Sequence, residues 1–299
     1  VSESQALGAV FTPIGSKQSP VQFVYRQSTA PNGRWTLLAS RAILGNMSNL
    51  NALSLPLFLY GTAWKEAETE RLALLAVQQG FRGIDTANQR KHYHKAGVGA
   101  AIQAAIRDGL ITREDLFLQT KFTFRGGQDH RLPYDEHAPP PQQVQQSFAS
   151  SLEHLGVSSL DSYVLHGPSQ RVGLVAADWE AWRAMEQFHA EGKTRFLGIS
   201  NVSSEQLEQL IQGAKVKPRF VQNRCYASRG WDREVRKLCT TNNIIYQGFS
   251  LLTANRDVLV HPLVASIAQR YRRATTHVVF RFALDVGMLP LTGTTSTAH

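Results

Sequence analysis

The chain has 299 residues and a mass of 33.2 kDa, and 42% of its residues are apolar, which is enough for one large core. Its net charge is +9, but the basic residues are scattered rather than clustered, which argues against a nucleic-acid partner. No stretch approaches the roughly 18–20 consecutive apolar residues of a membrane helix, and Cys225 and Cys239 fit neither a disulfide framework nor a zinc site. We therefore expect a soluble protein with no membrane span and no bound metal.

The first fifty residues differ in composition from the rest. They hold one acidic residue, Glu3, against four basic residues and seven serines. This composition resembles an organellar transit segment, so both the cytoplasm and an organelle such as the mitochondrion or plastid stay open; the alternative is an ordered extension that serves assembly or has no targeting role. Two alternating runs, 21–25 and 34–38, flank the turn signal Ala-Pro-Asn-Gly and predict a β-hairpin. We expect an N-terminal extension over residues 1–50 and a folded barrel over 51–299.

Beyond residue 55, short apolar runs alternate with longer amphipathic segments. The predicted strands are Leu57–Tyr60, Gly83–Thr86, Leu116–Lys121, Asp161–His166, Arg195–Ser200, Phe220–Asn223, Ile244–Phe249 and Met288–Leu291. Helical periods lie between them; Val98, Ile102 and Ile106, for example, recur every four residues. Ser203 to Gln206 has the pattern of a capping box and predicts a helix start. The last connection is longer, with helical patterns over 262–271 and 276–286.

Eight strands that alternate with helices indicate parallel pairing through right-handed crossovers. Both a closed barrel and a doubly wound open sheet have this alternation of strands and helices. The open dinucleotide-binding sheet carries Gly-x-Gly-x-x-Gly after its first strand, but here Gly97-Val98-Gly99 follows a loop and lacks the third glycine. We therefore predict an α/β protein with a (β/α)8 TIM barrel, whose site lies at the carboxyl ends of the strands.

Polar side chains end five consecutive predicted strands. In chain order they are Asp85, Lys121, His166, the pair Ser200-Asn201, and Gln222. Because the carboxyl ends of parallel strands meet at one mouth of a barrel, we expect these side chains to converge there.

Taken in chain order, these polar strand ends resemble those of the aldo-keto reductase family. The motifs that carry the resemblance are Gly61-Thr62-Ala63-Trp64, Gly83-Ile84-Asp85-Thr86-Ala87, Thr120-Lys121, Leu165-His166-Gly167-Pro168, Gly198-Ile199-Ser200-Asn201, Val221-Gln222-Asn223 and Leu289-Pro290. They span roughly residues 55–295. Members of this family are (β/α)8 barrels that use NADPH to reduce aldehydes and ketones, so the resemblance implies an NAD(P)H-dependent oxidoreductase that acts on a small-molecule carbonyl substrate.

Carbonyl reduction by hydride leaves an alkoxide, which needs a proton from a nearby acid. The resemblance implies Tyr93 as that acid. A lysine ammonium favours the phenolate and lowers a tyrosine pKa, and a carboxylate can hold the lysine. Lys121 and Asp85 would fill these two roles, and His166 would align the substrate carbonyl.

The resemblance also implies a binding site for the cofactor NADP(H), with NAD(H) as the alternative. Ser200, Asn201 and Gln222 would hold the nicotinamide carboxamide, and Phe249 would lie against the nicotinamide ring. Trp64 would contact the substrate. The complete set of expected cofactor contacts is Gly61, Thr62, Thr86, Ser200, Asn201, Gln222, Phe249, Ser250, Leu251, Thr292, Gly293 and Thr294.

The sequence departs from the family in its tyrosine loop. The tyrosine usually follows the aspartate by five residues, but that position is Arg90 here, and Tyr93 follows Asp85 by eight. The loop must therefore bulge by three residues to place the phenol. His92 and His94 are the alternative acids.

Two further departures lie near the C-terminus. Where the family usually has Pro-Lys-Ser, with a lysine that meets the 2′-phosphate of the cofactor, this chain has Pro290-Leu291-Thr292. Backbone N–H groups and the hydroxyl groups of residues 294–296 are the alternative phosphate ligands. The sequence stops just after the eighth strand, so the eighth helix is expected to be missing. These departures favour a second hypothesis, in which a non-catalytic barrel is a structural or regulatory subunit of a larger assembly.

Overall fold

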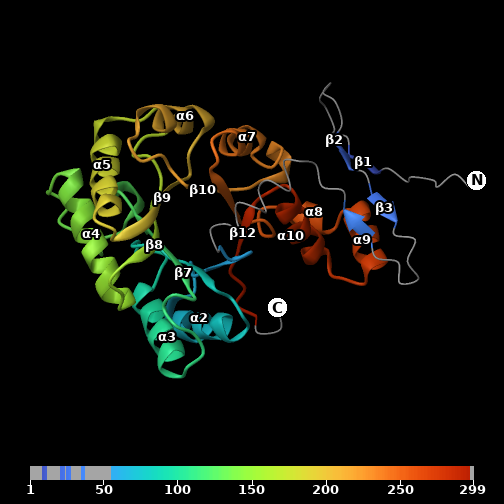
Figure 1. Cartoon of the computed structure of the whole chain (residues 1–299), viewed down its shortest axis with the longest axis horizontal. Coiled ribbons are helices and arrows are strands. Elements are labelled where there is room, and N and C mark those ends of the chain that lie inside the picture. The colour runs from blue at the N-terminus through green and yellow to red at the C-terminus, as the bar shows by residue number, and fades with distance from the viewer. Residues whose placement is uncertain (1–8, 12–20, 24, 28–34, 38–54, 297–299) are drawn as a thin grey trace, which may run out of the picture.

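A computed structural model of the chain describes residues 9–11, 21–23, 25–27, 35–37 and 55–296. Eight parallel strands form a closed barrel in the order β10-β11-β12-β5-β6-β7-β8-β9 (Figure 1). The barrel strands are β5 (Leu59–Gly61), β6 (Gly83–Asp85), β7 (Phe117–Phe122), β8 (Leu160–Leu165), β9 (Thr194–Ser200), β10 (Phe220–Arg224), β11 (Ile245–Phe249) and β12 (Leu289–Thr292). Each overlaps one predicted strand, so the predicted (β/α)8 barrel is confirmed at the level of strand order and closure.

The helices lie outside the strands, as Figure 1 shows. They are α2 (Thr69–Gln78), α3 (Lys95–Arg107), α4 (Pro140–Leu155), α5 (Ala176–Ala190), α6 (Ser204–Gly213), α7 (Arg233–Thr241), α8 (Arg256–Leu259), α9 (Pro262–Tyr271) and α10 (Thr275–Asp285), with short 3₁₀ turns η1 (Glu66–Glu68), η2 (Arg125–Gly127) and η3 (Ala227–Arg229). None of them, within the described ranges, is long and apolar enough to cross a membrane. From β12 to Ser296, where the described residues end, no helix follows.

Local sequence signals account for several helix boundaries. Ser203 caps α6 as a capping box: its hydroxyl accepts from the Gln206 backbone N–H at 3.2 Å, and the Gln206 side chain accepts from the Ser203 N–H at 3.1 Å. Gly156 ends α4 in the left-handed conformation at φ 66°, which a glycine adopts at little cost. The apolar faces of α2 to α7 therefore lie at defined positions against the strands.

Two apolar layers fill the molecule. The larger one packs the outer faces of the strands against the helices, with Trp182, Tyr163 and Phe148 fully buried in it. The smaller one lies inside the barrel and includes Phe117 and Phe220, whose ring centroids are 5.4 Å apart. Phe117 begins β7, whereas Lys121 lies four residues further on, near the other end of the strand. The smaller apolar layer therefore fills the amino end of the barrel, and polar side chains lie at the carboxyl end.

Among the described residues, four short strands precede the barrel in the chain. β3 (Tyr25–Gln27) pairs antiparallel with β4 (Trp35–Leu37), and β1 (Ala9–Phe11) pairs antiparallel with β2 (Val21–Phe23). The predicted hairpin joined residues 21–25 to 34–38, but only its second half and Tyr25 take part in that pairing. Residues 21–23 pair with β1 instead. The predicted turn at residues 30–33 lies outside the described residues.

Candidate active site

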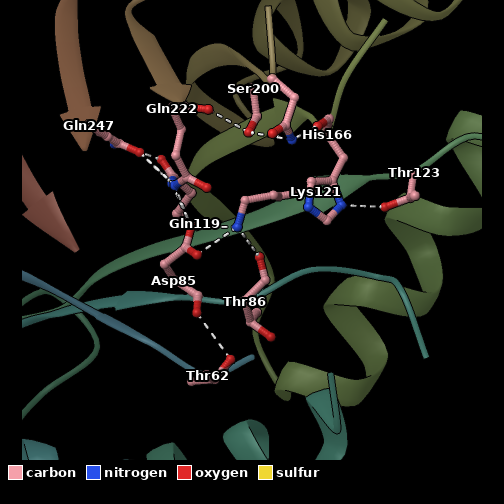
Figure 2. Close-up of polar contacts among 11 residues, drawn as sticks. Thr62, Asp85, Thr86, Gln119, Lys121, Thr123, His166, Ser200, Gln222 and Gln247 are labelled. Carbon is pink, nitrogen blue, oxygen red and sulfur yellow. Dashed lines mark hydrogen bonds and ion pairs between the residues drawn. The ribbon is translucent and has the colours of Figure 1, made fainter. Parts of the chain in front are cut away.

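A buried ion pair lies at the centre of the barrel mouth. The Lys121 Nζ is 2.6 Å from both carboxylate oxygens of Asp85, and it also donates to the backbone oxygen of Thr86 at 2.9 Å (Figure 2). Lys121 is fully buried, and Asp85 is 2% exposed. Burial lowers the pKa of Lys121, and the charge of Asp85 opposes this shift. The two side chains come from neighbouring strands, β7 and β6, so strand pairing brings them together.

Three glutamines surround the ion pair. Gln119 and Gln222 each donate through Nε2 to Asp85 Oδ1, at 2.7 and 3.0 Å, and both also donate to the Gln247 oxygen. Gln247 donates back to the Gln119 oxygen at 3.0 Å. Figure 2 shows these side chains pointing toward one another from β7, β10 and β11. The Asp85 carboxylate thus accepts from two amides as well as from the ammonium, which fixes its position in a site without solvent.

Backbone contacts hold the loop that follows β6. The Asn88 N–H donates to the Lys121 oxygen at 3.0 Å, and the Asn88 side chain donates to the Ser147 oxygen on α4 at 2.8 Å. The Gln89 side chain donates to the Gly127 oxygen at 2.6 Å, and its backbone oxygen accepts from the Tyr93 N–H. These contacts turn the chain back toward the barrel mouth before α3 begins at Lys95.

The loop brings Tyr93 to the ion pair and to His166. The Lys121 Nζ lies 5.5 Å from the centroid of the Tyr93 ring, and the Tyr93 and His166 rings are 6.1 Å apart in an edge-to-face arrangement. Burial, followed by the negative charge of Asp85, raises the pKa of Tyr93. This is opposite to the lowering expected from Lys121, because burial disfavours the charged phenolate and the Asp85 carboxylate adds to this effect. The phenol is therefore protonated at neutral pH.

His166 is neutral in this environment. Its Nδ1 lies 2.6 Å from the Thr123 hydroxyl oxygen, and its backbone N–H donates to the Phe122 oxygen. Burial, the Lys121 charge and then His92 lower the pKa of His166 to about 3. Among the described residues, no hydrogen-bond partner contacts Nε2. A neutral imidazole anchored through Nδ1 can thus offer Nε2 to a ligand.

Trp64 and the two histidines near Tyr93 lie at the rim of the site. Trp64 is 66% exposed, has φ 61°, and packs its ring 3.7 Å from that of His92. His92 Nδ1 is buried and finds no hydrogen-bond partner in the described part of the chain, whereas His94 is exposed. Tyr93 also lines a cavity of about 700 Å³ beside the loop. An exposed aromatic side chain at this rim could contact a bound substrate, as predicted for Trp64.

The expected carboxamide-binding residues form a second polar cluster. Ser200 donates to the Gln222 backbone oxygen at 2.6 Å, and Asn201 donates to Ser200 Oγ and to the His166 backbone oxygen. The Gln222 amide N–H groups already bind Asp85 and Gln247, which leaves the side-chain oxygen of Gln222 for a ligand. A cavity of about 420 Å³ is lined by both Asn201 and Phe249. Of the three expected carboxamide ligands, Asn201 therefore shares this cavity with the Phe249 ring, whereas Ser200 and Gln222 do not line it.

The ends of β5 and β12 complete the rim. The Thr62 hydroxyl donates to the Asp85 backbone oxygen, and a Cβ on Gly293 would lie 2.7 Å from the Gly61 oxygen, so only glycine allows this close approach. The Thr86 hydroxyl oxygen is buried without a partner in the described residues, which leaves one polar atom for a ligand. Together with the cavity beside Phe249, these features fit a nicotinamide cofactor.

The remaining predicted contacts differ in position. Ser250 is partly buried and has φ 56°, whereas Leu251 packs in the hydrophobic core. Thr292 is partly buried, and the Thr294 hydroxyl binds the Ser296 N–H at 3.0 Å. The predicted phosphate turn is thus held in part by its own hydrogen bonds.

Sequence reasoning missed several residues of this site. Gln119 precedes Lys121 by two positions on one strand, so period-two alternation indicates that both face the barrel interior. Gln247 stands in the same relation to Phe249. Thr123 and Lys65 give no comparable signal, because their partners His166 and Gly293 are distant in the chain.

The comparisons with known proteins agree with this architecture. Residues 57–299 match the model of the aldo/keto reductase family. The uncharacterized oxidoreductase YtbE of Bacillus subtilis is 30% identical over 243 residues, which are 81% of this chain and 79% of that protein. The aldo-keto reductase Rv2971 of Mycobacterium tuberculosis is 32% identical over 74% of this chain and 70% of its own length. A Bombyx mori aldo-keto reductase solved in complex with NADP has the same fold, with a TM-score of 0.66, 22% identity, and coverage of 82% of this chain and 81% of that one. This chain belongs to the aldo/keto reductase family.

Proposed function

We propose that this oxidoreductase reduces a small aldehyde or ketone to an alcohol with NADPH or NADH. One observation carries the proposal: a buried Lys121–Asp85 pair, the Tyr93 ring and the neutral His166 lie together at the barrel mouth. In this proposal the nicotinamide ring would lie against Phe249, which lines a cavity together with Asn201. Family membership makes this reaction class the first to test.

The bound nicotinamide would supply the hydride, which adds to the carbonyl carbon and leaves negative charge on the oxygen. In our proposal, the Tyr93 hydroxyl donates its proton to that oxygen and becomes phenolate. An alkoxide is a stronger base than a phenolate, so the transfer is favourable even though the pKa of Tyr93 is raised. The partly exposed phenolate then recovers a proton from solvent.

Lys121 and His166 assist without giving up protons. The ammonium lies 5.5 Å from the centroid of the Tyr93 ring and stabilises the phenolate as it forms, while Asp85 and its amides fix the ammonium. The Thr123 hydroxyl lies 2.6 Å from His166 Nδ1, and in our proposal it donates to Nδ1, which places the single imidazole proton on Nε2. Nε2 then donates to the substrate oxygen and orients the carbonyl.

The proposal extends to the organisation of the chain and its cofactor. We assign the activity to residues 51–299 and treat 1–50 as an extension outside the reaction. NADPH is the first cofactor to test because the Bombyx mori structure holds NADP, and NADH is the second because Leu291 cannot pair with a phosphate. The substrate is a small carbonyl compound that enters past Trp64.

The experiment is cofactor oxidation with an aromatic aldehyde, measured in parallel for the wild type and Tyr93→Phe. We expect turnover in the wild type and loss of about 10²-fold or more in the variant. The melting temperature should not change, because the Tyr93 hydroxyl has no hydrogen-bond partner among the described residues. His94→Phe is the matched control in the same loop and should keep its activity. Turnover that survives Tyr93→Phe would refute Tyr93 as the donor, and an inactive wild type would favour the non-catalytic barrel.

A further inference from the structure

A cavity of about 700 Å³ lies beside the tyrosine loop, which runs over residues 86–94 between β6 and α3. Cationic side chains line it from three parts of the chain: Arg90 and Lys91 from the loop, Lys95 from the start of α3, and Arg131 from the segment after β7. Among the described residues that line it, Glu66 is the only acidic one. The cavity therefore has an excess of positive charge, which favours an anionic ligand.

Three of these cations have no acidic partner. Arg131 pairs with Asp129, whereas Arg90, Lys91 and Lys95 contact no carboxylate in the part of the chain that the structure describes. Arg90 and Lys91 are exposed, so water compensates their charges. Lys95 is only 5% exposed, so water cannot do the same for its ammonium.

The surroundings of Lys95 leave its ammonium without a compensating charge. The Nζ donates to the Ser151 hydroxyl oxygen on α4 at 2.8 Å, which uses one of its three N–H donors. Burial, followed by the charge of Arg90, lowers the pKa of Lys95. Lys121 is buried to a similar degree, but there Asp85 supplies the opposing charge. An anion in the cavity would act on Lys95 in the same way, because it would oppose both causes of the shift.

The start of α3 adds to the positive charge at the cavity. Lys95 is the first residue of this 13-residue helix, and the side chain of the N-cap residue His94 makes no capping hydrogen bond. The first turn carries no acidic residue. The N–H groups at a helix start attract anions. Lys95 and Ala96 both line the cavity, so the helix start and the buried ammonium border the same space.

Tyr93, the proposed proton donor, lines this cavity as well and precedes Lys95 by two residues. We propose that the cavity binds an anionic group, a carboxylate or a phosphate, through Lys95, Arg90 and the start of α3. The anion belongs either to the carbonyl substrate, whose reacting end then lies at Tyr93, or to a separate small anion. The first source rests on the proposed function, whereas the anion site itself does not.

The binding test is a titration of the full chain with inorganic phosphate, followed by the melting temperature at constant ionic strength, with chloride as the balancing anion. Lys95→Met keeps the length of the side chain and removes the charge; Lys217→Met, in the exposed segment before β10, is the control. We expect phosphate to stabilise the wild type, and Lys95→Met to raise the apparent dissociation constant about tenfold or more. Lys217→Met should leave it unchanged.

A second variant guards against a change in folding. Each variant is compared with itself without phosphate, so a shift in its basal melting temperature does not enter the result. Arg90→Gln alters an exposed side chain that makes no hydrogen bond within the described residues, so it should leave the fold intact. It should weaken phosphate binding in the same direction as Lys95→Met.

Kinetics in phosphate-free buffer decides the source of the anion. Linear aldehydes that end in a carboxylate are compared, at several chain lengths, with uncharged aldehydes of the same length. A substrate anion predicts a kcat/KM about tenfold or more higher for the carboxylated aldehyde at the length that spans the site, and loss of this preference in Lys95→Met. Equal kcat/KM values in the wild type, together with a phosphate response that Lys95→Met abolishes, assign the site to a separate anion.

Two results would overturn the inference. One is a Lys95→Met variant that leaves both the phosphate response and the carboxylate preference unchanged, and the other is a wild type that shows neither. If no aldehyde is turned over but Lys95→Met weakens phosphate binding, the proposed function fails and the anion site stands. The two proposals therefore fail separately.

Discussion

The Lys121–Asp85 pair allows a sharp prediction about buried charge. Asp85→Asn keeps the shape of the side chain but removes the charge that compensates a fully buried ammonium. The remaining acceptors of the Lys121 Nζ are then the Thr86 oxygen and the new amide oxygen. Removing one partner of a buried ion pair costs about 3–5 kcal/mol. At roughly 2–4 °C per kcal/mol for a barrel of this size, the melting temperature should fall by roughly 6–20 °C.

The assay is thermal unfolding at several pH values, with Glu68→Gln as the matched control. Glu68 pairs with Arg71 at 2.7 Å, nearly the same distance, but both side chains are more than half exposed, so this change should cost less than about 1 kcal/mol. Without the carboxylate, burial lowers the pKa of Lys121 further below its unfolded value. The unfolded chain then binds more protons than the folded chain. The loss of unfolding free energy in Asp85→Asn, relative to the wild type, should therefore shrink as pH rises.

Two results would refute this reasoning. The first is a loss of stability in Asp85→Asn that is no larger than the loss in Glu68→Gln. This would mean that burial does not strengthen the ion pair. The second is a deficit that stays constant or grows with rising pH, because an unpaired buried ammonium must become less costly as it loses its proton. The double variant Asp85→Asn with Lys121→Met should be more stable than the sum of the two single losses.

Three further predictions follow from single residues. Gly99→Ala should lower the free energy of unfolding by about 3 kcal/mol or more in denaturant, because its Cβ would overlap the His154 backbone oxygen on α4. Gly126→Ala is the control and should change it little, because open space surrounds Gly126. Ser203→Ala should cost about 1 kcal/mol through the lost cap of α6; an unchanged midpoint would contradict this. The ring signals of His166 in NMR should not titrate between pH 5 and 8, since its pKa lies at about 3, and its contribution to stability should fall as pH decreases below about 6.5.

The strands and helices of the barrel are predictable from local sequence patterns. Apolar runs and helical periods are local properties, so they placed all eight strands within a few residues and located the start of α6 at Ser203. The order of strands also follows from the chain, because parallel neighbours need crossover helices. Consequently the sequence alone predicts that Asp85, Lys121 and His166 lie at one mouth of the barrel.

Which of these residues interact, and in what geometry, depends on the tertiary fold. The position of Tyr93 depends on anchors from β7, η2 and α4 to the loop after β6, and sequence spacing could not show that a loop longer by three residues still reaches His166. The direction of its pKa shift was also out of reach, because it depends on burial and on the distance to Asp85.

The contacts between residues that are distant in the chain arise from closure of the barrel. Gln119 and Gln247 meet although 128 positions separate them, and Lys65 reaches Gly293 across 228 positions. Strand β12 pairs with β5, the last barrel strand with the first, and this pairing brings the Lys65 loop to the end of β12. A linear pattern carries no information on such distant neighbours, because their contact arises only from the curvature and register of the closed sheet.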